Sequence, residues 1–237
     1  MSSGAVHKLQ GADASLPVTR REVLAIAHQL HQRGWVANHD GNISVRLPGK
    51  RWLLTPTAIS KRVLVENDLI VVDADGRVLQ GGRRPFSEFK MHMAIYDARP
   101  DVRAVVHCHA PSATALSVLA VEVDPQLIAE AVVSLGDRVP MARYHFPNSA
   151  DALAELRQLA QNHDVVTMQN HGLLGWGDDL EQAFLRSELV EHLATIQQRA
   201  LLAGKPQRIP KADVARLLEK RASAGLGAEG RRRRKSP

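Results

Sequence analysis

The segment from Val105 to His109 constrains the fold of this chain more than any other stretch. It reads Val-Val-His-Cys-His, an apolar run that ends in two histidines separated by one residue. Successive side chains of a β-strand point to opposite faces, so His107 and His109 share one face and Cys108 takes the other. Two imidazoles on one face of a stiff strand can supply two ligands to a divalent metal such as zinc. A lone His-x-His pair is also common as the polar end of a strand.

Asn170-His171-Gly172 supplies a third imidazole that would make the metal site specific. It closes a second predicted strand, which begins at residue 165. With His107 and His109, His171 would leave one coordination position open, as a catalytic zinc site does and a structural one does not. His92 is the alternative ligand, and packing within a helix is its other interpretation.

Glu88 is the candidate acid–base residue. It lies at the start of a predicted helix that has Ser87 as its N-cap and runs to about Ala98, and the dipole at this end of the helix favours the ionised carboxylate. Beside a metal it could move a proton to or from a substrate, whereas alone it would only stabilise the first helical turn. Lys61 and Lys90 could add positive charge, but long lysine side chains are usually solvated. Turn amides and hydroxyls near a helix start are typical of phosphate sites, and the candidates here are Gly41-Asn42, Thr55-Pro56-Thr57 and Ser87.

Helix and strand patterns are mixed along the chain. A capping box at Thr19 predicts one helix, Ser149 caps another, and the longest runs from Asp179 to about Ala203. Turn dipeptides between short apolar runs predict hairpins, and no Gly-x-Gly-x-x-Gly or Walker motif follows a strand. We therefore expect an α/β fold in which helices cover an antiparallel or mixed sheet. Further strands are expected near residues 43–46, 52–55, 69–73, 78–79, 131–134 and 139–143, and a further helix over 210–222.

The positive charge of the chain is concentrated at its C-terminus. The 237 residues include 31 basic and 25 acidic ones, and the run from Arg231 to Lys235 contains five of the basic residues. The remainder, 26 basic against 25 acidic, is nearly neutral, so the composition gives no basis for specific nucleic-acid binding. We expect a flexible N-terminus over 1–18, a single domain over 19–222 and a disordered basic tail over 223–237.

The remaining composition favours a cytoplasmic protein. The single cysteine excludes an internal disulfide framework, and no secretory signal pattern precedes residue 18. No run of 18 apolar residues occurs, so we expect no membrane span.

Taken in order, the motifs resemble those of the class II aldolase/adducin family, of the fuculose phosphate aldolase type. They are Gly41-Asn42-Ile43-Ser44, Thr55-Pro56-Thr57, Ser87-Glu88, His107-Cys108-His109 and Asn170-His171-Gly172, and the likeness spans about residues 19–203. The resemblance implies a three-layer α/β/α domain with a central, mainly antiparallel sheet, and a homotetramer with active sites between subunits. It also implies that the three histidines hold Zn²⁺ or another divalent metal and that Glu88 is the acid/base. The positions that it implies for the substrate phosphate are Gly41, Asn42, Thr57 and Ser87.

Three departures from the family pattern bear on the substrate. The phosphate loop, often Thr-Pro-Ser-Gly, ends here in Thr57-Ala58, and the paired serines before the glutamate are replaced by Phe86-Ser87. One phosphate hydroxyl is therefore lost. A tyrosine that the family's aldolases supply from a neighbouring subunit has no counterpart between residues 110 and 129. Glutamate after Ser87 favours the aldolase branch over the ribulose phosphate 4-epimerase branch.

The leading hypothesis is a zinc-dependent aldolase that cleaves a carbon–carbon bond in a small sugar phosphate through a metal-stabilised enediolate. Glu88 would shuttle the proton at the carbon that becomes nucleophilic, and the resemblance implies dihydroxyacetone phosphate as the ketose fragment. The alternatives are a sugar-acid phosphate decarboxylase or epimerase with the same zinc site, and a non-enzymatic, adducin-like interaction domain. Bound metal would distinguish the enzyme from the interaction domain.

Overall fold

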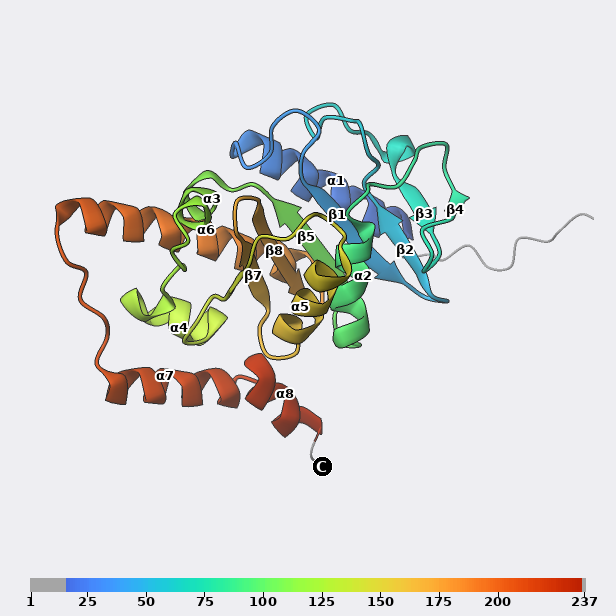
Figure 1. Cartoon of the computed structure of the whole chain (residues 1–237). Helices are drawn as coiled ribbons and strands as arrows, with labels where there is room; N and C mark the ends of the chain where they lie inside the picture. Colours follow the sequence, from blue (N-terminus) through green and yellow to red (C-terminus); the bar gives the residue numbers. More distant parts are fainter. Residues whose placement is uncertain (1–15, 236–237) are drawn as a thin grey trace, which may run out of the picture.

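One sheet of eight strands forms the middle layer of the protein (Figure 1). The structure is a computed structural model and describes residues 16–235. The spatial order of the strands is β4-β3-β2-β1-β5-β8-β7-β6, and every neighbouring pair is antiparallel except β6 and β7. The predicted mainly antiparallel sheet is therefore confirmed. The strands are β1 (Asn42–Leu47), β2 (Arg51–Leu54), β3 (Ile70–Val72), β4 (Val78–Gln80), β5 (Ala104–Cys108), β6 (Met141–Ala142), β7 (Val165–Met168) and β8 (Gly172–Gly177).

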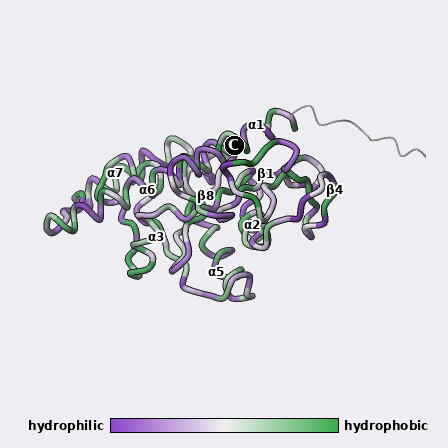
Figure 2. Tube along the Cα trace, turned by 90° about the horizontal axis from the view of Figure 1, so that it is seen from above, coloured by the Kyte–Doolittle hydropathy of each residue, from purple (hydrophilic) through white to green (hydrophobic). Residues whose placement is uncertain are grey.

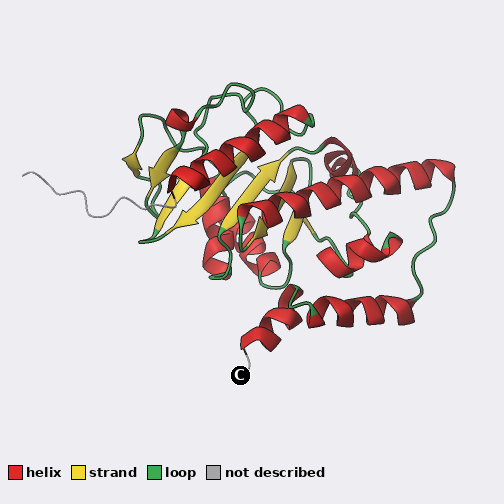
Figure 3. Ribbon diagram, turned by 180° about the vertical axis from the view of Figure 1, so that it is seen from behind, coloured by secondary structure: helices red, strands yellow, loops and turns green. Residues whose placement is uncertain are grey.

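Helices cover both faces of the sheet, which completes the predicted three layers. Helices α2 and α5 lie on the face turned to the viewer in Figure 1, and α1 and α6 cross the opposite face, which Figure 3 shows from behind. The α-helices are α1 (Leu16–Gln32), α2 (Phe89–Ala98), α3 (Pro111–Val118), α4 (Ala129–Leu135), α5 (Ala150–Ala160), α6 (Leu180–Ala203), α7 (Lys211–Ser223) and α8 (Gly227–Lys235). Two short 3-10 helices, η1 (Glu66–Asp68) and η2 (Pro125–Leu127), lie in the connections.

Two apolar cores lie on the two sides of the sheet, and β5 contributes to both. Val105 belongs to the core that includes Ile95 of α2, whereas Val106 and Cys108 belong to the core that includes Leu30 of α1. This alternation follows from the two-residue period of a strand, and it directs the odd-numbered side chains of β5 towards the α2 side. Figure 2 shows hydrophilic and hydrophobic residues interspersed along the chain. The sheet therefore presents His107 on the same side as the start of α2.

The starts of two helices differ from their predictions. Helix α1 begins at Leu16, so the capping box predicted at Thr19 is wrong because the chain is already helical there. Helix α2 begins at Phe89 with Glu88 as its N-cap residue, so the predicted cap at Ser87 is wrong, and no side-chain hydrogen bond caps the helix. The cap at Ser149 is confirmed, because its Oγ accepts a hydrogen bond from the backbone N–H of residue 152.

Two segments in the second half of the chain were assigned incorrectly or missed. Residues 129–135 form helix α4 instead of the predicted strand over 131–134, with Ala131, Val132 and Leu135 buried along one side. This i, i+1, i+4 spacing fits a helical face, and helix α7 packs against it. Strand β8 was not predicted; it forms an antiparallel hairpin with β7, and residues 169–171 make the turn.

The C-terminal residues differ from the predicted disordered tail. Helices α7 and α8 lie along one side of the body in Figure 1, and residues 204–210 connect them to α6. Helix α8 docks because Arg231 pairs with the buried carboxylate of Asp164 at 2.9 Å.

At the N-terminal end, residues 16–18 belong to α1, and the predicted flexible residues 1–15 lie outside the described part of the chain. Among the described residues, no helix has the length and apolarity needed to cross a membrane.

Candidate metal centre and acid–base site

The fold brings His107, His109 and His171 together. His107 lies in β5 and His109 directly follows that strand, while His171 is in the turn before β8, the neighbour of β5. Each of the three residues offers one ring nitrogen, and these nitrogens all lie within 4.8 Å of one another. The ring centroids are 4.8–5.1 Å apart. The predicted trio therefore converges on one point at the end of the central strands.

A backbone hydrogen bond orients the most buried of these rings. Nδ1 of His107 donates to the carbonyl oxygen of Leu173 at 2.9 Å, which leaves Nε2 as the acceptor that faces the other rings. Burial lowers the pKa of His107 to about 3, so the ring is neutral at neutral pH. Neutral imidazole with an outward-facing nitrogen is the form that binds metals.

The three imidazoles fit a divalent cation. Nε2 of His109 lies 3.1 Å from Nε2 of His107, and Nδ1 of His109 lies 3.6 Å from a carboxylate oxygen of Asp40. Zinc–nitrogen bonds of about 2.1 Å in tetrahedral geometry separate two ligand nitrogens by roughly 3.4 Å, which is close to this spacing. His109 and His171 are half-buried, so the trio opens to one side. A nitrogen-rich set with an open position favours zinc over calcium or magnesium.

Glu88 lies against the histidine trio, immediately before α2. Its Oε1 is 3.0 Å from Nε2 of His171, and its Oε2 is 3.6 Å from Nε2 of His107. Oε2 also accepts a hydrogen bond from Nδ2 of Asn42 at 2.7 Å. Burial opposes ionisation, but the two imidazoles and the Asn42 amide outweigh it and hold the pKa of Glu88 well below its usual value. Glu88 is therefore an ionised carboxylate at neutral pH.

The four residues predicted to bind phosphate have different surroundings. Asn42 is 4% exposed and is engaged with Glu88, while its carbonyl oxygen Oδ1 is buried without a partner among the described residues. Gly41 has a φ of +68°, and a Cβ there would lie 3.0 Å from the carbonyl oxygen of His107, so only glycine fits. Thr57 is half-buried, and Ser87 is exposed directly before Glu88.

Lys61 is a residue of this site that the sequence reasoning undervalued. Its side chain was expected in solvent, yet the residue is only 2% exposed, and Nζ donates to the carbonyl oxygen of His39 at 3.1 Å. Burial lowers the pKa of Lys61 to about 8, although Asp40 and Glu88 attract its charge. The only sequence feature that could have pointed to Lys61 was its position four residues after Thr57, in the segment that follows the predicted phosphate loop. That spacing does not reveal that the segment folds back towards His39 and buries the lysine.

His92, the alternative ligand, lies outside the histidine trio. It is fully buried, and its Nδ1 lies 2.7 Å from Oγ of Ser44, whose hydroxyl also contacts the Tyr96 hydroxyl at 2.8 Å. Burial lowers the pKa of His92 to about 3. The ring thus packs beneath the site as a neutral group.

A cavity of about 270 Å³ adjoins the trio on the side of His171. Its wall includes Tyr144, Gln169 and Asn170 as well as the apolar side chains of Met91 and Leu156. The space beside His171 thus has room for a small polar molecule with some apolar surface.

Comparison with known proteins identifies the family of this chain. The sequence model of the class II aldolase and adducin N-terminal domain matches residues 21–198. L-fuculose phosphate aldolase of Escherichia coli is 30% identical over 210 residues, which cover 88% of this chain and 96% of that protein. The 5-methylthioribulose-1-phosphate/5-deoxyribulose-1-phosphate aldolase of Rhodospirillum rubrum is also 30% identical over 210 residues, with coverage of 89% and 94%.

Solved structures give the same result. An L-fuculose 1-phosphate aldolase superposes with a TM-score of 0.79 at 27% identity, covering 88% of this chain and 97% of that one. YgbL of Escherichia coli, whose description leaves aldolase, epimerase and decarboxylase activity open, gives 0.77 at 29% identity with coverage of 85% and 98%. The chain belongs to the class II aldolase and adducin family. Its curated relatives and structural neighbours place it among the enzymes of that family, the class II aldolases.

Proposed function

We propose that this protein is a zinc-dependent aldolase that cleaves a carbon–carbon bond in a small sugar phosphate. The observation that carries the proposal is the contact of Glu88 with His171, 3.0 Å apart, inside a trio of imidazoles whose nitrogens lie within 4.8 Å. Aldolase relatives that act on fuculose phosphate and on ribulose 1-phosphates support the substrate class.

His107, His109 and His171 would hold the metal. When bound, a divalent cation supplies positive charge that stabilises the negative charge developing on substrate oxygens during carbon–carbon cleavage. The hydrogen bond from His107 to the carbonyl of Leu173 keeps one ligand in the correct tautomer and orientation.

Glu88 would transfer the proton at carbon. On cleavage the hydroxyl that becomes the aldehyde loses its proton to the Glu88 carboxylate, directly or through water, and the electron pair of the broken bond is left on the ketose half. Glu88, now protonated, delivers that proton to the carbon; in the synthetic direction the carboxylate removes it. The Nδ2 donor of Asn42 fixes the carboxylate 2.7 Å away, so the group is positioned before substrate arrives.

The substrate phosphate would bind next to the start of α2. Gly41, Thr57 and Ser87 supply backbone or hydroxyl groups there, and Lys61 supplies the positive charge. Because Phe86 replaces a serine, one hydroxyl that could bind the phosphate is missing, and binding by uncharged groups alone is weaker. The buried ammonium of Lys61 therefore becomes the main anion-binding group.

A sugar-acid phosphate decarboxylase is the second candidate for the same site. The buried ammonium of Lys61, the replacement of a serine by Phe86 and the likeness to YgbL favour it. Both reactions leave negative charge on a carbon next to a carbonyl group, so the same residues would serve. Release of carbon dioxide, rather than of an aldehyde, distinguishes the decarboxylase.

Metal analysis and turnover test the proposal together. Purified protein should contain near-stoichiometric zinc, and His107→Ala should lose it, whereas His192→Ala, at an exposed position of α6, should keep it. Glu88→Gln should retain zinc but lose cleavage of phosphorylated ketoses, with Lys90→Gln on the exposed side of α2 as the control. Protein that binds no divalent metal, or a Glu88→Gln variant with full activity, would contradict the proposed function.

A homotetramer is part of the same proposal. Several large apolar side chains are exposed on the isolated chain, among them Leu202 at 90%, Phe146 at 77% and Leu119 at 69%. Such side chains favour burial against other copies of the chain. Light scattering coupled to size-exclusion chromatography should give about four times the chain mass of 26.0 kDa; a monomeric mass would contradict the assembly.

A further inference from the structure

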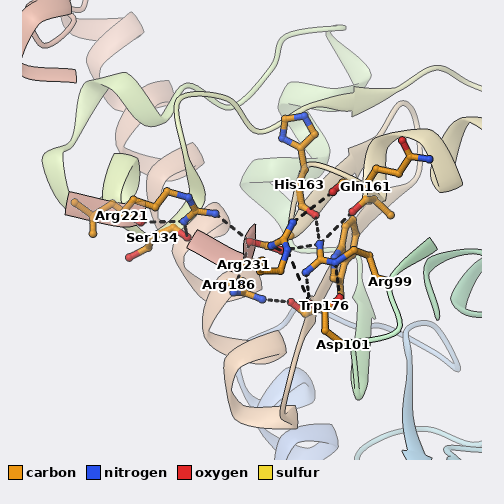
Figure 4. Close-up of polar contacts among 12 residues, drawn as sticks. Arg99, Asp101, Ser134, Gln161, His163, Trp176, Arg186, Arg221 and Arg231 are labelled. Atoms are coloured by element: carbon orange, nitrogen blue, oxygen red, sulfur yellow. Dashed lines mark hydrogen bonds and ion pairs between the residues drawn. The ribbon is translucent and has the colours of Figure 1, made fainter. Parts of the chain in front are cut away.

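A cluster of arginines surrounds one buried carboxylate at the end of the sheet opposite to the histidines. Asp164 directly precedes β7, whereas His171 follows that strand, and Asp164 is 1% exposed. Four guanidinium groups lie within 3.6 Å of its oxygens (Figure 4). They come from separate parts of the chain and belong to Arg99, Arg186 of α6, Arg221 of α7 and Arg231 of α8.

Three of these arginines use the hydrogen-bonding capacity of Asp164. Its Oδ1 accepts from Nη1 of Arg99 at 3.0 Å and from Nη1 of Arg231 at 2.9 Å. Its Oδ2 accepts from Nη2 of Arg221 at 3.0 Å. The carboxylate is therefore already shared among three guanidinium groups.

Arg186 is left with unused donors. It lies 3.6 Å from Oδ2 of Asp164, an ion pair without a hydrogen bond, and its one hydrogen bond within the described chain is to the carbonyl oxygen of Trp176. Arg186 is only 9% exposed, so solvent reaches little of it. Burial and repulsion by Arg99 outweigh the attraction of Asp164 and lower the pKa of Arg186.

A cavity of about 150 Å³ lies beside these unused donors. Arg99, Arg186 and Arg231 line it together with residues 225–227. Two carboxylates also border it, but Asp101 is already held by two hydrogen bonds from Arg99 at 2.9 and 2.8 Å. The other, Asp178, is exposed to solvent and makes no hydrogen bond to Arg186. The carboxylates of Asp101 and Asp178 thus lie at the rim of the cavity, and the donors of Arg186 that make no hydrogen bond to the described chain lie beside it.

The loop on the other wall of the cavity also favours an anion. Gly225 and Gly227 have φ values of +74° and +68°, which turn the chain sharply into the first turn of α8. The free amides at a helix N-terminus attract negative charge. Arg231, one turn further along α8, lines the same cavity, so the guanidinium groups and the helix start act on one volume.

We propose that this cavity binds a tetrahedral oxyanion of the phosphate type, which joins Arg186 of α6 to Arg231 and the start of α8. The anion completes the hydrogen bonds of Arg186 and fastens the C-terminal helix to the body of the protein. This site is separate from the candidate active site, since β7 lies between Asp164 and His171.

Trypsin cleavage in α8 measures this fastening, because Arg232 and Arg233 are exposed cleavage positions within the helix. The full chain, loaded with zinc, is digested in inorganic phosphate or in chloride at equal ionic strength, and the products are identified by mass. Cleavage in α8 should slow saturably, by about tenfold when phosphate reaches ten times its dissociation constant. Arg186→Gln should abolish the protection, whereas Arg199→Gln, at an exposed position of the same helix, should retain it. Equal protection of the Arg186→Gln variant, or none in the parent protein, would overturn the proposal.

A second measurement uses the parent protein and therefore needs no variant. Crystals of the parent protein grown in selenate, a phosphate-shaped anion, should show selenium between Arg186 and Arg231. Selenium confined to the histidine site would overturn the C-terminal site while leaving the proposed aldolase function intact. Conversely, a parent protein that binds no divalent metal, or a Glu88→Gln variant with full activity, would contradict the aldolase function without any bearing on α8, so the two proposals fail separately.

Discussion

Replacement of Gly172 by alanine should separate the strands that carry the histidines. A Cβ at this position would lie 2.5 Å from the carbonyl oxygen of Cys108 and 2.7 Å from Cδ2 of His109. Real Cβ atoms essentially never approach other atoms within 3.0 Å, so β8 must move from β5 by at least about 0.5 Å, or the His109 ring must turn away. Because His171 directly precedes Gly172, the same shift changes the spacing of all three imidazoles.

The displacement is large enough to affect both stability and metal binding. Overpacking of this kind costs about 1–3 kcal/mol of folding free energy. Metal sites hold their ligand distances within about 0.2 Å, so a shift of about 0.5 Å exceeds what the site tolerates. We expect the zinc dissociation constant of Gly172→Ala to rise by about 10–100-fold, equivalent to about 1.4–2.8 kcal/mol.

Two measurements on the same preparations test this reasoning. Competition with a chromophoric chelator gives the zinc affinity, and the urea midpoint gives the stability. Gly82→Ala is the matched control, since nothing lies within 4 Å of a Cβ at position 82. A Gly172→Ala variant whose zinc affinity stays within twofold of the parent would refute the coupling, whether or not its urea midpoint falls.

Three further predictions follow from buried charges and their partners. Lys61→Met should raise KM for a phosphorylated ketose by about tenfold, and the parent KM should rise as pH passes about 8, where Lys61 loses its proton; a flat profile between pH 7 and 9 would remove Lys61 from phosphate binding. Asn42→Ala should keep zinc but lower kcat by about tenfold, because Glu88 loses the donor 2.7 Å from Oε2; an unchanged kcat would show that the histidines alone position the carboxylate. The four arginines outweigh burial and lower the pKa of Asp164 from 3.8 to about 2, so its stabilisation is complete above pH 3.8 and is lost as pH falls towards 2. Urea midpoints between pH 2 and 5 should fall with pH in the parent, and they should fall less in Asp164→Asn.

The sequence predicted those parts of the site whose position follows from strand periodicity. His107 and His109 lie at and just after the end of β5, and His171 lies at the end of a second apolar strand, as expected. Hairpins and helices were also predictable, because turn dipeptides and the cap at Ser149 act over a few residues. The three-layer arrangement depended on the ordered set of motifs, since no single motif specifies how sheet and helices pack.

Features that depend on distant contacts could not be predicted. Lys61 is buried because its loop folds back towards His39, which no local pattern encodes. The basic run at the C-terminus had the composition of a disordered tail, yet Arg231 finds Asp164, 67 residues away in the chain. Residues 131–134 have a sequence pattern typical of a strand, but residues 129–135 form a helix because α7 packs against them.

The only cysteine of the chain has a use that its chemistry alone would not suggest. Cys108 is fully buried in the central strand, on the face turned away from the imidazoles, and burial raises the pKa of its thiol to about 12. A thiol of this kind reacts with alkylating reagents only when the strand opens to solvent. The rate at which Cys108 is alkylated therefore reports how often the sheet opens beneath the histidines, and no probe residue has to be introduced by mutation.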